Sequence, residues 1–258
     1  MKRLALITVL SATALLSVAI AHGELVQNGN LRLIFGGRLT PHSLPRDRDV
    51  PVKVSLTGSV RTADGTRPPR LRHISIAVNR YGKLYTKGLP TCQPGLLEST
   101  DSPLAMERCG DALVGRGQFS ANVEFPSQVP FPVAGKMLAF NGRAHGRPAI
   151  FLHIHGSNPV EATVVLTFAI THPRRGKFGT VLTTRIPLIA SNLGYVTDVS
   201  LVFGRTYRYA GKQRSFISAR CAAPAGFPGA LFSLAKGIFT FDGGQRLTTT
   251  LVRDCLVR

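Results

Sequence analysis

Residues 237–251 read Gly-Ile-Phe-Thr-Phe-Asp-Gly-Gly-Gln-Arg-Leu-Thr-Thr-Thr-Leu. Apolar residues alternate with polar or small ones before and after the pair Asp242-Gly243. Successive side chains of a β-strand point to opposite faces, so this alternation predicts two half-buried strands, and Asp-Gly between them is a strong hairpin signal. The sequence therefore predicts an antiparallel β-meander at the C-terminal end.

The same alternation recurs along most of the chain. It occupies five further stretches: Val50–Val60, Ile74–Val78, Ile150–Ile154, Val164–Ile170 and Val199–Phe203. Gly, Pro, Asn and Asp separate these stretches, as turns between short strands require. Outside the first 21 residues we expect one short helix, between Pro103 and Arg108, in a chain without other helical periodicity. The prediction is an all-β fold, an antiparallel β-sandwich or barrel-like sheet of about a dozen short strands.

Three segments between the strands are expected to be irregular. Thr40–Asp49 contains two prolines and is predicted to be a connecting loop, because proline cannot donate to a β-ladder. Pro126–Pro132 is a proline-rich crossing segment, and Gly88–Asp111 has no period at all. We expect one exported domain, residues 22–258, in which a division would fall near the basic turn at 173–179.

The first 21 residues have the three parts of a secretory signal peptide. Lys2 and Arg3 are positive, Leu4–Val18 is almost uninterruptedly apolar, and Ala19-Ile20-Ala21 is a typical cleavage site. The alternative is a retained membrane anchor, because the run is close to the shortest that spans a bilayer. We expect cleavage before His22 and a secreted or cell-surface protein whose mature chain has no transmembrane segment.

Four cysteines behind a signal peptide predict two disulfides, for which three pairings exist. We expect the two local ones. Cys92–Cys109 would tether the aperiodic loop, and Cys221–Cys255 would join the strand before the C-terminal hairpin to the strand after it. Each would contribute about 3 to 4 kcal/mol by the chain-entropy estimate.

The chain is strongly basic. It contains 32 Lys and Arg against 13 Asp and Glu, and loss of Lys2 and Arg3 with the signal peptide leaves 30 against 13, a net charge of +17. Such a charge attracts polyanions, for example an anionic envelope polymer or lipid headgroups. The alternative is that arginine simply serves as the solubilising residue of this chain.

Three groups of basic residues are expected at turns: Arg67, Arg70 and Arg72; Arg174, Arg175 and Lys177; Lys212 and Arg214. If these turns meet at one end of the fold, they form an anion-binding rim, and if they scatter, they are ordinary solvated ends. Without interleaved aromatic residues, the groups predict no specific binding of nucleic acid.

A His-x-His pair, His153 and His155, is the best candidate for a metal site. Residues two apart on a strand share a face, so both imidazoles would be able to bind one metal ion. With Gly146 before it and Glu161 after it, the pair is similar to the first motif of the cupin family. Six residues separate Gly146 from His153 and five separate His155 from Glu161, each one more than the family pattern has, and no second motif follows. The alternative is that both histidines face solvent or a second layer.

Three functions therefore follow from the sequence. The first is a non-enzymatic exported β-domain, without a cofactor, that binds an anionic or protein partner at the cell envelope. The second is a metal-dependent small-ligand enzyme or binder that uses His153 and His155. The third is a barrel-type carrier of a small apolar ligand, recognisable by an internal cavity lined by the alternating residues. The sequence favours a binding protein over an enzyme and leaves the oligomeric state open.

The C-terminal part also resembles a group of exported bacterial proteins that carry no assigned activity. The resemblance rests on the runs Arg214–Cys221, Pro224–Pro228, Phe239–Gly243 and Arg253–Cys255. It implies a secreted, disulfide-paired β-protein and no catalytic residues.

Overall fold

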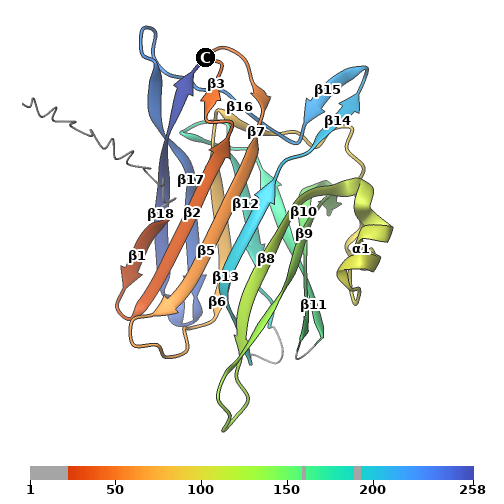
Figure 1. The fold of residues 1–258 in the computed structure, drawn as a ribbon, viewed down its shortest axis with the longest axis vertical. Coiled ribbons are helices and arrows are strands. Elements are labelled where there is room, and N and C mark those ends of the chain that lie inside the picture. Colours follow the sequence, from red (N-terminus) through yellow and green to blue (C-terminus); the bar gives the residue numbers. More distant parts are fainter. Residues whose placement is uncertain (1–22, 159–160, 189–192) are drawn as a thin grey trace, which may run out of the picture.

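The computed structural model describes residues 23–158, 161–188 and 193–258. The predicted signal peptide, residues 1–21, and the expected first mature residue His22 lie outside these ranges. Strands dominate the described residues, and thirteen of the strands found there form one large curled sheet (Figure 1). The all-β prediction is confirmed.

The strands across this sheet are, in spatial order, β1 (Glu24–Asn28), β2 (Leu31–Thr40), β5 (Lys53–Thr62), β13 (Gly194–Phe203), β8 (Leu113–Val123), β9 (Phe131–Ala144), β10 (Arg147–Asn158), β11 (Ala162–Thr171), β12 (Phe178–Arg185), β6 (Leu71–Asn79), β17 (Gly229–Phe241), β18 (Arg246–Val257) and β3 (Ser43–Leu44). The order starts at β1, and the C-terminal strand β18 is its last long strand, followed only by the short strand β3. Neighbours pair antiparallel, except that β3 pairs parallel with β18. Because several of these pairs join strands that are far apart in the sequence, most contacting residues are distant from each other along the chain.

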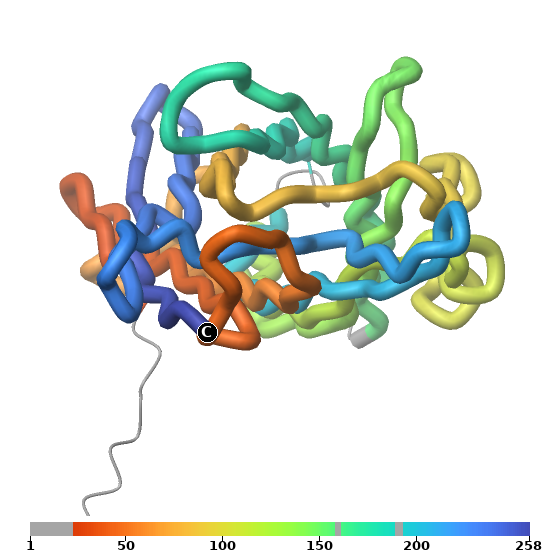
Figure 2. Tube along the Cα trace, turned by 90° about the horizontal axis from the view of Figure 1, so that it is seen from above, coloured from red at the N-terminus to blue at the C-terminus, as the bar shows by residue number. Residues whose placement is uncertain are grey.

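The curl brings the two ends of the sheet together. Arg253 of β18 donates from Nε to the carbonyl oxygen of Gly37 in β2 at 2.8 Å, and its Nη1 lies 3.1 Å from Oε1 of Glu24 in β1. Viewed from above, the trace follows a flattened outline (Figure 2). One face of the sheet therefore points inward and the other points to solvent.

The hairpin that the sequence predicted is the pair β17–β18. Phe239 lies opposite Leu247, and the turn η4 (Asp242–Gly244) contains two glycines with positive φ. Such a φ suits glycine, which lacks the Cβ that clashes there. Phe239, Phe241, Leu247 and Leu251 are buried in one cluster with Leu31, Leu33 and Phe35 of β2. The alternation thus packs this hairpin against the other end of the sheet.

Smaller elements cover the upper end of the sheet as drawn in Figure 1. A three-stranded sheet lies there, in the order β4 (Val50–Pro51), β16 (Ile217–Ala219) and β7 (Gly82–Leu84). The hairpin β14 (Thr206–Tyr209) with β15 (Lys212–Ser215) projects beside it. Tyr207 and Tyr209 thus belong to this separate hairpin and do not continue β13.

The aperiodic loop after β7 holds the expected helix, α1 (Ser102–Cys109), between the short turns η1 (Pro94–Leu96) and η2 (Gly110–Ala112). The side chain of Asp101 caps α1 by accepting from the amide of Leu104 at 2.8 Å. An N-cap of this type satisfies one of the free amides of the first turn, and Pro103 suits that turn because it needs no amide.

The cysteines pair as expected. Cys92 and Cys109 are bonded with their Cα atoms 5.4 Å apart, and Cys221 and Cys255 with theirs 5.7 Å apart. Disulfides persist in oxidising surroundings, so the two bonds indicate a non-cytoplasmic environment. No helix within the described ranges is both long and apolar enough to cross a bilayer.

Several boundaries differ from the prediction. The segment Thr40–Asp49, predicted to be a connecting loop, contains the short strand β3. The proline-rich segment Pro126–Pro132 is the tip of the hairpin β8–β9, not a crossing, and Pro132 lies inside β9. The turn near residue 173 joins β11 and β12, which pair with each other in the same sheet.

Candidate ligand-binding cavity

The inward face of the curled sheet leaves two adjoining cavities. The upper lobe has a volume of about 120 Å³ and the lower lobe about 200 Å³. Both lobes share the same middle wall, formed by Leu56, Ile76, Leu152, Phe168 and Leu201. An apolar cavity of about 150 Å³ takes a benzene-sized molecule and stays dry without one. The lower lobe is therefore large enough for a ring-sized apolar group, and the upper lobe extends the same apolar space.

The residues of the predicted alternation supply most of the lining. Besides the shared wall, Val54, Val78, Ile150 and Phe203 line the upper lobe, and Val60, Ile74, Ile154 and Val199 line the lower one. Many of these inward residues, such as Leu56 and Ile76, are only half-buried, whereas Leu251 in the packed hairpin is fully buried. Protein interiors are normally close-packed. The solvent-accessible surface that these side chains retain therefore lines an open interior and not a filled core.

One polar side chain of the upper lobe, that of Asn79, has its hydrogen-bond partners within the wall. Asn79 is buried, donates from Nδ2 to the carbonyl of Ser233 at 2.9 Å, and accepts from the amide of Tyr81 at 2.9 Å. A buried amide with its partners satisfied does not need a ligand. This polar group stabilises the wall and leaves the lobe free for apolar contact.

The two ends of the cavity are closed differently. The small sheet β4–β16–β7 covers the upper lobe with hydrogen-bonded backbone, and Cys221 beside it is bonded to Cys255 of β18. The lower lobe is bordered by Pro68 and Pro69 of the loop before β6, by Ile186 and Pro187 after β12, and by Tyr195 of β13. Loops open at lower free energy than paired strands. The lower end is the easier route into the cavity.

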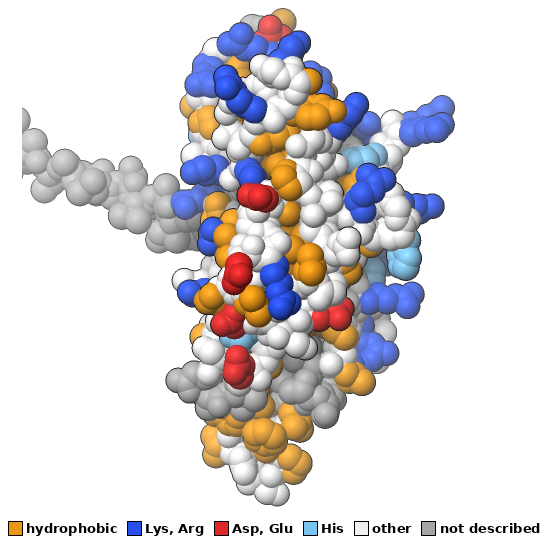
Figure 3. Space-filling model, turned by 90° about the vertical axis from the view of Figure 1, so that its right-hand side faces the viewer, with side chains coloured by type: hydrophobic (Ala, Val, Ile, Leu, Met, Phe, Trp, Pro, Cys, Tyr) orange, Lys and Arg blue, Asp and Glu red, His pale blue; other side chains and the backbone are white. Residues whose placement is uncertain are grey.

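The predicted basic residues do not meet at one end. Arg67, Arg70 and Arg72 lie at the lower end, where Arg70 and Arg72 contact Asp242 in the turn of β17–β18. Arg174, Arg175 and Lys177 lie in the turn between β11 and β12, and Lys212 and Arg214 lie in β15, both at the upper end and on different sides of it in Figure 2. On the face shown in Figure 3, acidic and apolar side chains interrupt the basic ones. A single rim made of all three groups does not form.

The lower group is engaged by acids. Arg70 lies 3.2 Å from Asp242 through Nε, and Arg72 lies 3.3 Å from the same carboxylate. Arg67 lies 3.8 Å from Glu124 and stacks on the ring of Tyr195, with 5.5 Å from its guanidinium carbon to the ring centroid. Arg70 also lines the lower lobe. Of the predicted binding residues, Arg70 is thus the one that the structure places at the cavity.

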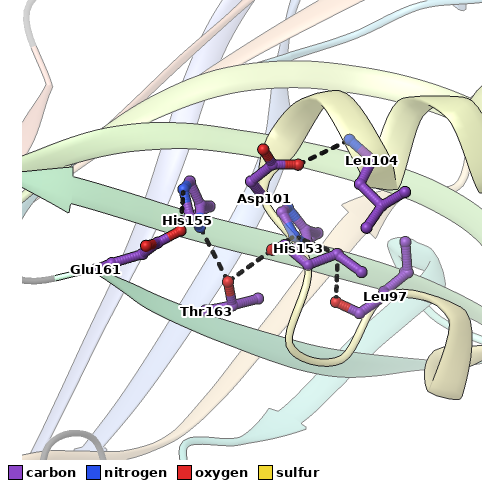
Figure 4. A network of polar contacts seen from close by, with 8 residues as sticks. Leu97, Asp101, Leu104, His153, His155, Glu161 and Thr163 are labelled. Atoms are coloured by element: carbon purple, nitrogen blue, oxygen red, sulfur yellow. Dashed lines mark hydrogen bonds and ion pairs between the residues drawn. The ribbon is translucent and has the colours of Figure 1, made fainter.

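His153 and His155 share a face of β10, as predicted, and that face lies under the loop before α1 (Figure 4). His153 is fully buried, with Nε2 at 2.9 Å from the carbonyl oxygen of Thr100. Nδ1 of His155 lies 2.9 Å from Oγ1 of Thr163, and this hydroxyl donates to the same carbonyl oxygen at 2.7 Å. The second layer that covers the two histidines is the disulfide-tethered loop.

These contacts fix which nitrogens carry protons. A carbonyl oxygen only accepts, so Nε2 of His153 donates to Thr100. The Thr163 hydroxyl donates its proton to the same oxygen, so Nδ1 of His155 must be the donor in its bond to Oγ1 of Thr163. Burial lowers the pKa of His153, and the nearby His155 lowers it further, although the Thr100 carbonyl opposes the shift. His153 is therefore neutral, with a buried Nδ1 that has no partner.

A metal ion would have to use the remaining nitrogens, Nδ1 of His153 and Nε2 of His155. Glu161 lies 4.0 Å from the latter. Across the described residues, no group of three or more His, Cys, Asp or Glu side chains is arranged to hold a metal ion. The contacts that are present attach the loop to the sheet, and metal binding by His153 and His155 stays a prediction.

The sequence does not predict the residues that contact Arg70 or the two histidines. The sequence marks Asp242 only as a turn residue, although this carboxylate binds Arg70, 172 positions earlier in the chain. Thr100 and Thr163 are isolated threonines, and the sequence around them gives no signal of their contacts with the histidines. Comparison of the chain with protein-family models, with curated proteins and with solved structures finds no match.

Proposed function

We propose that this protein is an exported, non-enzymatic binding protein that carries a small apolar molecule inside its curled sheet. The two adjoining lobes, lined by half-buried apolar side chains, are the observation that supports the proposal. Burial of apolar surface contributes about 25 cal/mol per Å² and needs no catalytic group. Small-molecule sites are typically of this kind, concave and mostly apolar.

The proposal takes the flattened sheet as a barrel-like shell rather than two independent layers. The contacts of Arg253 with Gly37 and Glu24 support this choice, because they join the two ends of the sheet. An anionic or protein partner at the cell envelope, the first prediction from the sequence, remains compatible with a carrier that delivers its ligand there.

A neutral fluorescent probe tests the proposal directly. N-phenyl-1-naphthylamine becomes bright in apolar surroundings, and we expect saturable binding of one molecule to the exported, disulfide-bonded protein. Ile76→Phe adds volume to the wall between the lobes and is expected to weaken binding about tenfold, or about 1.4 kcal/mol.

Val202→Phe is the matched control. Val202 lies on the solvent face of β13 and is 44% exposed, so the same added ring stays outside the cavity. We expect its probe affinity to equal that of the unaltered protein. The absence of saturable binding, with native circular dichroism, would refute the proposal, and so would equal effects of the two substitutions.

A further inference from the structure

One charged side chain lies in the wall of the lower lobe. Among the described residues that line this lobe, Arg70 alone carries a charge. Its side chain is 15% exposed, so its guanidinium is largely removed from water. Burying a charge is costly unless a partner of opposite sign compensates it. The partner of Arg70 therefore decides what the lobe accepts.

That partner is shared. Nε and Nη2 of Arg70 lie 3.2 and 3.5 Å from the two oxygens of Asp242, and Nε of Arg72 lies 3.3 Å from one of them. Two guanidinium groups thus face one carboxylate, which is itself 42% exposed. The Arg70–Asp242–Arg72 cluster therefore has a net charge of +1, and of its members Arg70 lines the lobe while Arg72 is 53% exposed.

We infer that the ligand is an amphiphile, an apolar body that fills the lobes with one terminal anionic group that pairs with Arg70. This inference rests on the proposed function and names the class of its ligand. Nε and Nη2 of Arg70 face Asp242, and the other edge of the planar guanidinium, formed by Nη1 and Nη2, offers a pair of donors that match a carboxylate or a phosphate group. A neutral hydrocarbon of the same size would fill the cavity but leave the excess charge of the Arg70–Asp242–Arg72 cluster uncompensated.

The upper end offers a second pair of cations, which the geometry disfavours. Lys83 and Arg220 border the upper lobe and share Asp49, at 2.6 and 3.9 Å. Their neighbours Leu84 and Ala219 pack into the interior cluster. Since side chains alternate along a strand, Lys83 and Arg220 point to the outer face of the small sheet. The head group is therefore assigned to the lower, loop-bordered end.

Matched competitors test the inference. Decanoate, decyl phosphate and 1-decanol share one apolar chain and differ in the head group, and each displaces bound N-phenyl-1-naphthylamine from the full exported protein. We expect at least one of the two anions to displace the probe at a concentration about tenfold lower than decanol requires. Comparison of decanoate with decyl phosphate identifies which head group the site prefers.

Substitutions locate the head group. Arg70→Gln is expected to remove the preference for the anion while decanol binds as before, and Arg70→Lys to retain part of it. Arg72→Gln removes the excess charge of the cluster and should reduce the preference, whereas Arg220→Gln removes the same charge at the other end of the cavity and should keep it. Added salt should weaken decanoate but not decanol, which tests the charge even if Arg70→Gln folds poorly.

The outcomes separate the two claims. If the neutral probe binds but decanol competes as well as both anions, the inference fails and the proposed carrier function stands. It fails equally if Arg70→Gln leaves the preference intact or if Arg220→Gln abolishes it. If the probe does not bind at all, the proposed function itself fails.

Discussion

Nε2 of His153 donates to the carbonyl oxygen of Thr100 over 2.9 Å, and this bond joins the middle of β10 to the loop that leads into α1. The hydroxyl of Thr100 donates to the carbonyl oxygen of Leu97, in the same loop, at 2.8 Å. The loop is thus held by a buried neutral histidine as well as by the Cys92–Cys109 bond.

The buried histidine predicts a pH dependence of stability. Burial lowers the pKa of His153 in the folded state, whereas the unfolded chain has the ordinary value of about 6.5. Between these values the unfolded state binds more protons, so acid favours unfolding. The stabilisation is complete above about pH 7 and is lost as the pH falls from about 6.5 through the lower folded-state pKa.

Urea unfolding at about pH 7.5 and about pH 5.5 measures this dependence, in a window above the ordinary carboxylate range. His153→Gln keeps a donor for Thr100 and does not titrate, so its stability should change less between the two conditions. An identical pH dependence in the two proteins would contradict the assignment to His153.

The two disulfides are predicted to contribute unequally. Cys221–Cys255 spans 34 positions and its cysteines belong to the main buried cluster, whereas Cys92–Cys109 spans 17. Chain entropy assigns about 4 and about 3 kcal/mol to loops of these sizes. We expect the pair Cys221→Ala and Cys255→Ala to lower the unfolding free energy more than Cys92→Ala and Cys109→Ala.

Hydrogen exchange distinguishes their effects further. Loss of Cys92–Cys109 should raise the exchange of amides in α1 selectively, because one tether of the loop is gone while the sheet pairing remains. Uniform acceleration over the whole sheet would show that this bond stabilises the global fold instead.

The fold class was accessible from sequence because alternation is a local signal. It placed β17 and β18, and it identified the side chains that line the cavity. It did not show that those side chains enclose a void, since a filled core and an open one give the same pattern. The prediction of a crossing segment at Pro126–Pro132 was wrong because an extended strand accepts a proline where its amide is not needed, as at Pro132 in β9. The pairing of Arg70 with Asp242 depends on β6 lying beside β17, which no local pattern encodes.

The uneven packing predicts unequal costs for the same truncation. Leu251→Ala removes a fully buried side chain from a packed cluster and should cost about 3 kcal/mol. Leu56→Ala removes a half-buried side chain that already borders the cavity, and should cost about half as much. Chemical denaturation measures both. Equal costs would indicate that the interior around Leu56 is filled in solution.

Gly135 permits the close approach of β9 to β10, and its replacement gives the last prediction. A Cβ at Gly135 would lie 2.0 Å from the carbonyl oxygen of His155 and 2.7 Å from the ring of Phe119. Both contacts are far inside van der Waals distance, and the first is with backbone that cannot rotate away. Gly135→Ala must therefore separate the strand that carries the two histidines from its neighbour, and should cost about 2 to 3 kcal/mol.

Gly95→Ala is the matched control, because a Cβ there meets nothing within 4 Å and its φ is not positive. That substitution should be neutral, or stabilise by up to about 1 kcal/mol by restricting the unfolded chain. The urea midpoints of the two variants provide the comparison. If they shift alike, β9 and β10 have room for a methyl group, and the close pairing that orients His155 toward Thr163 is not required by the fold.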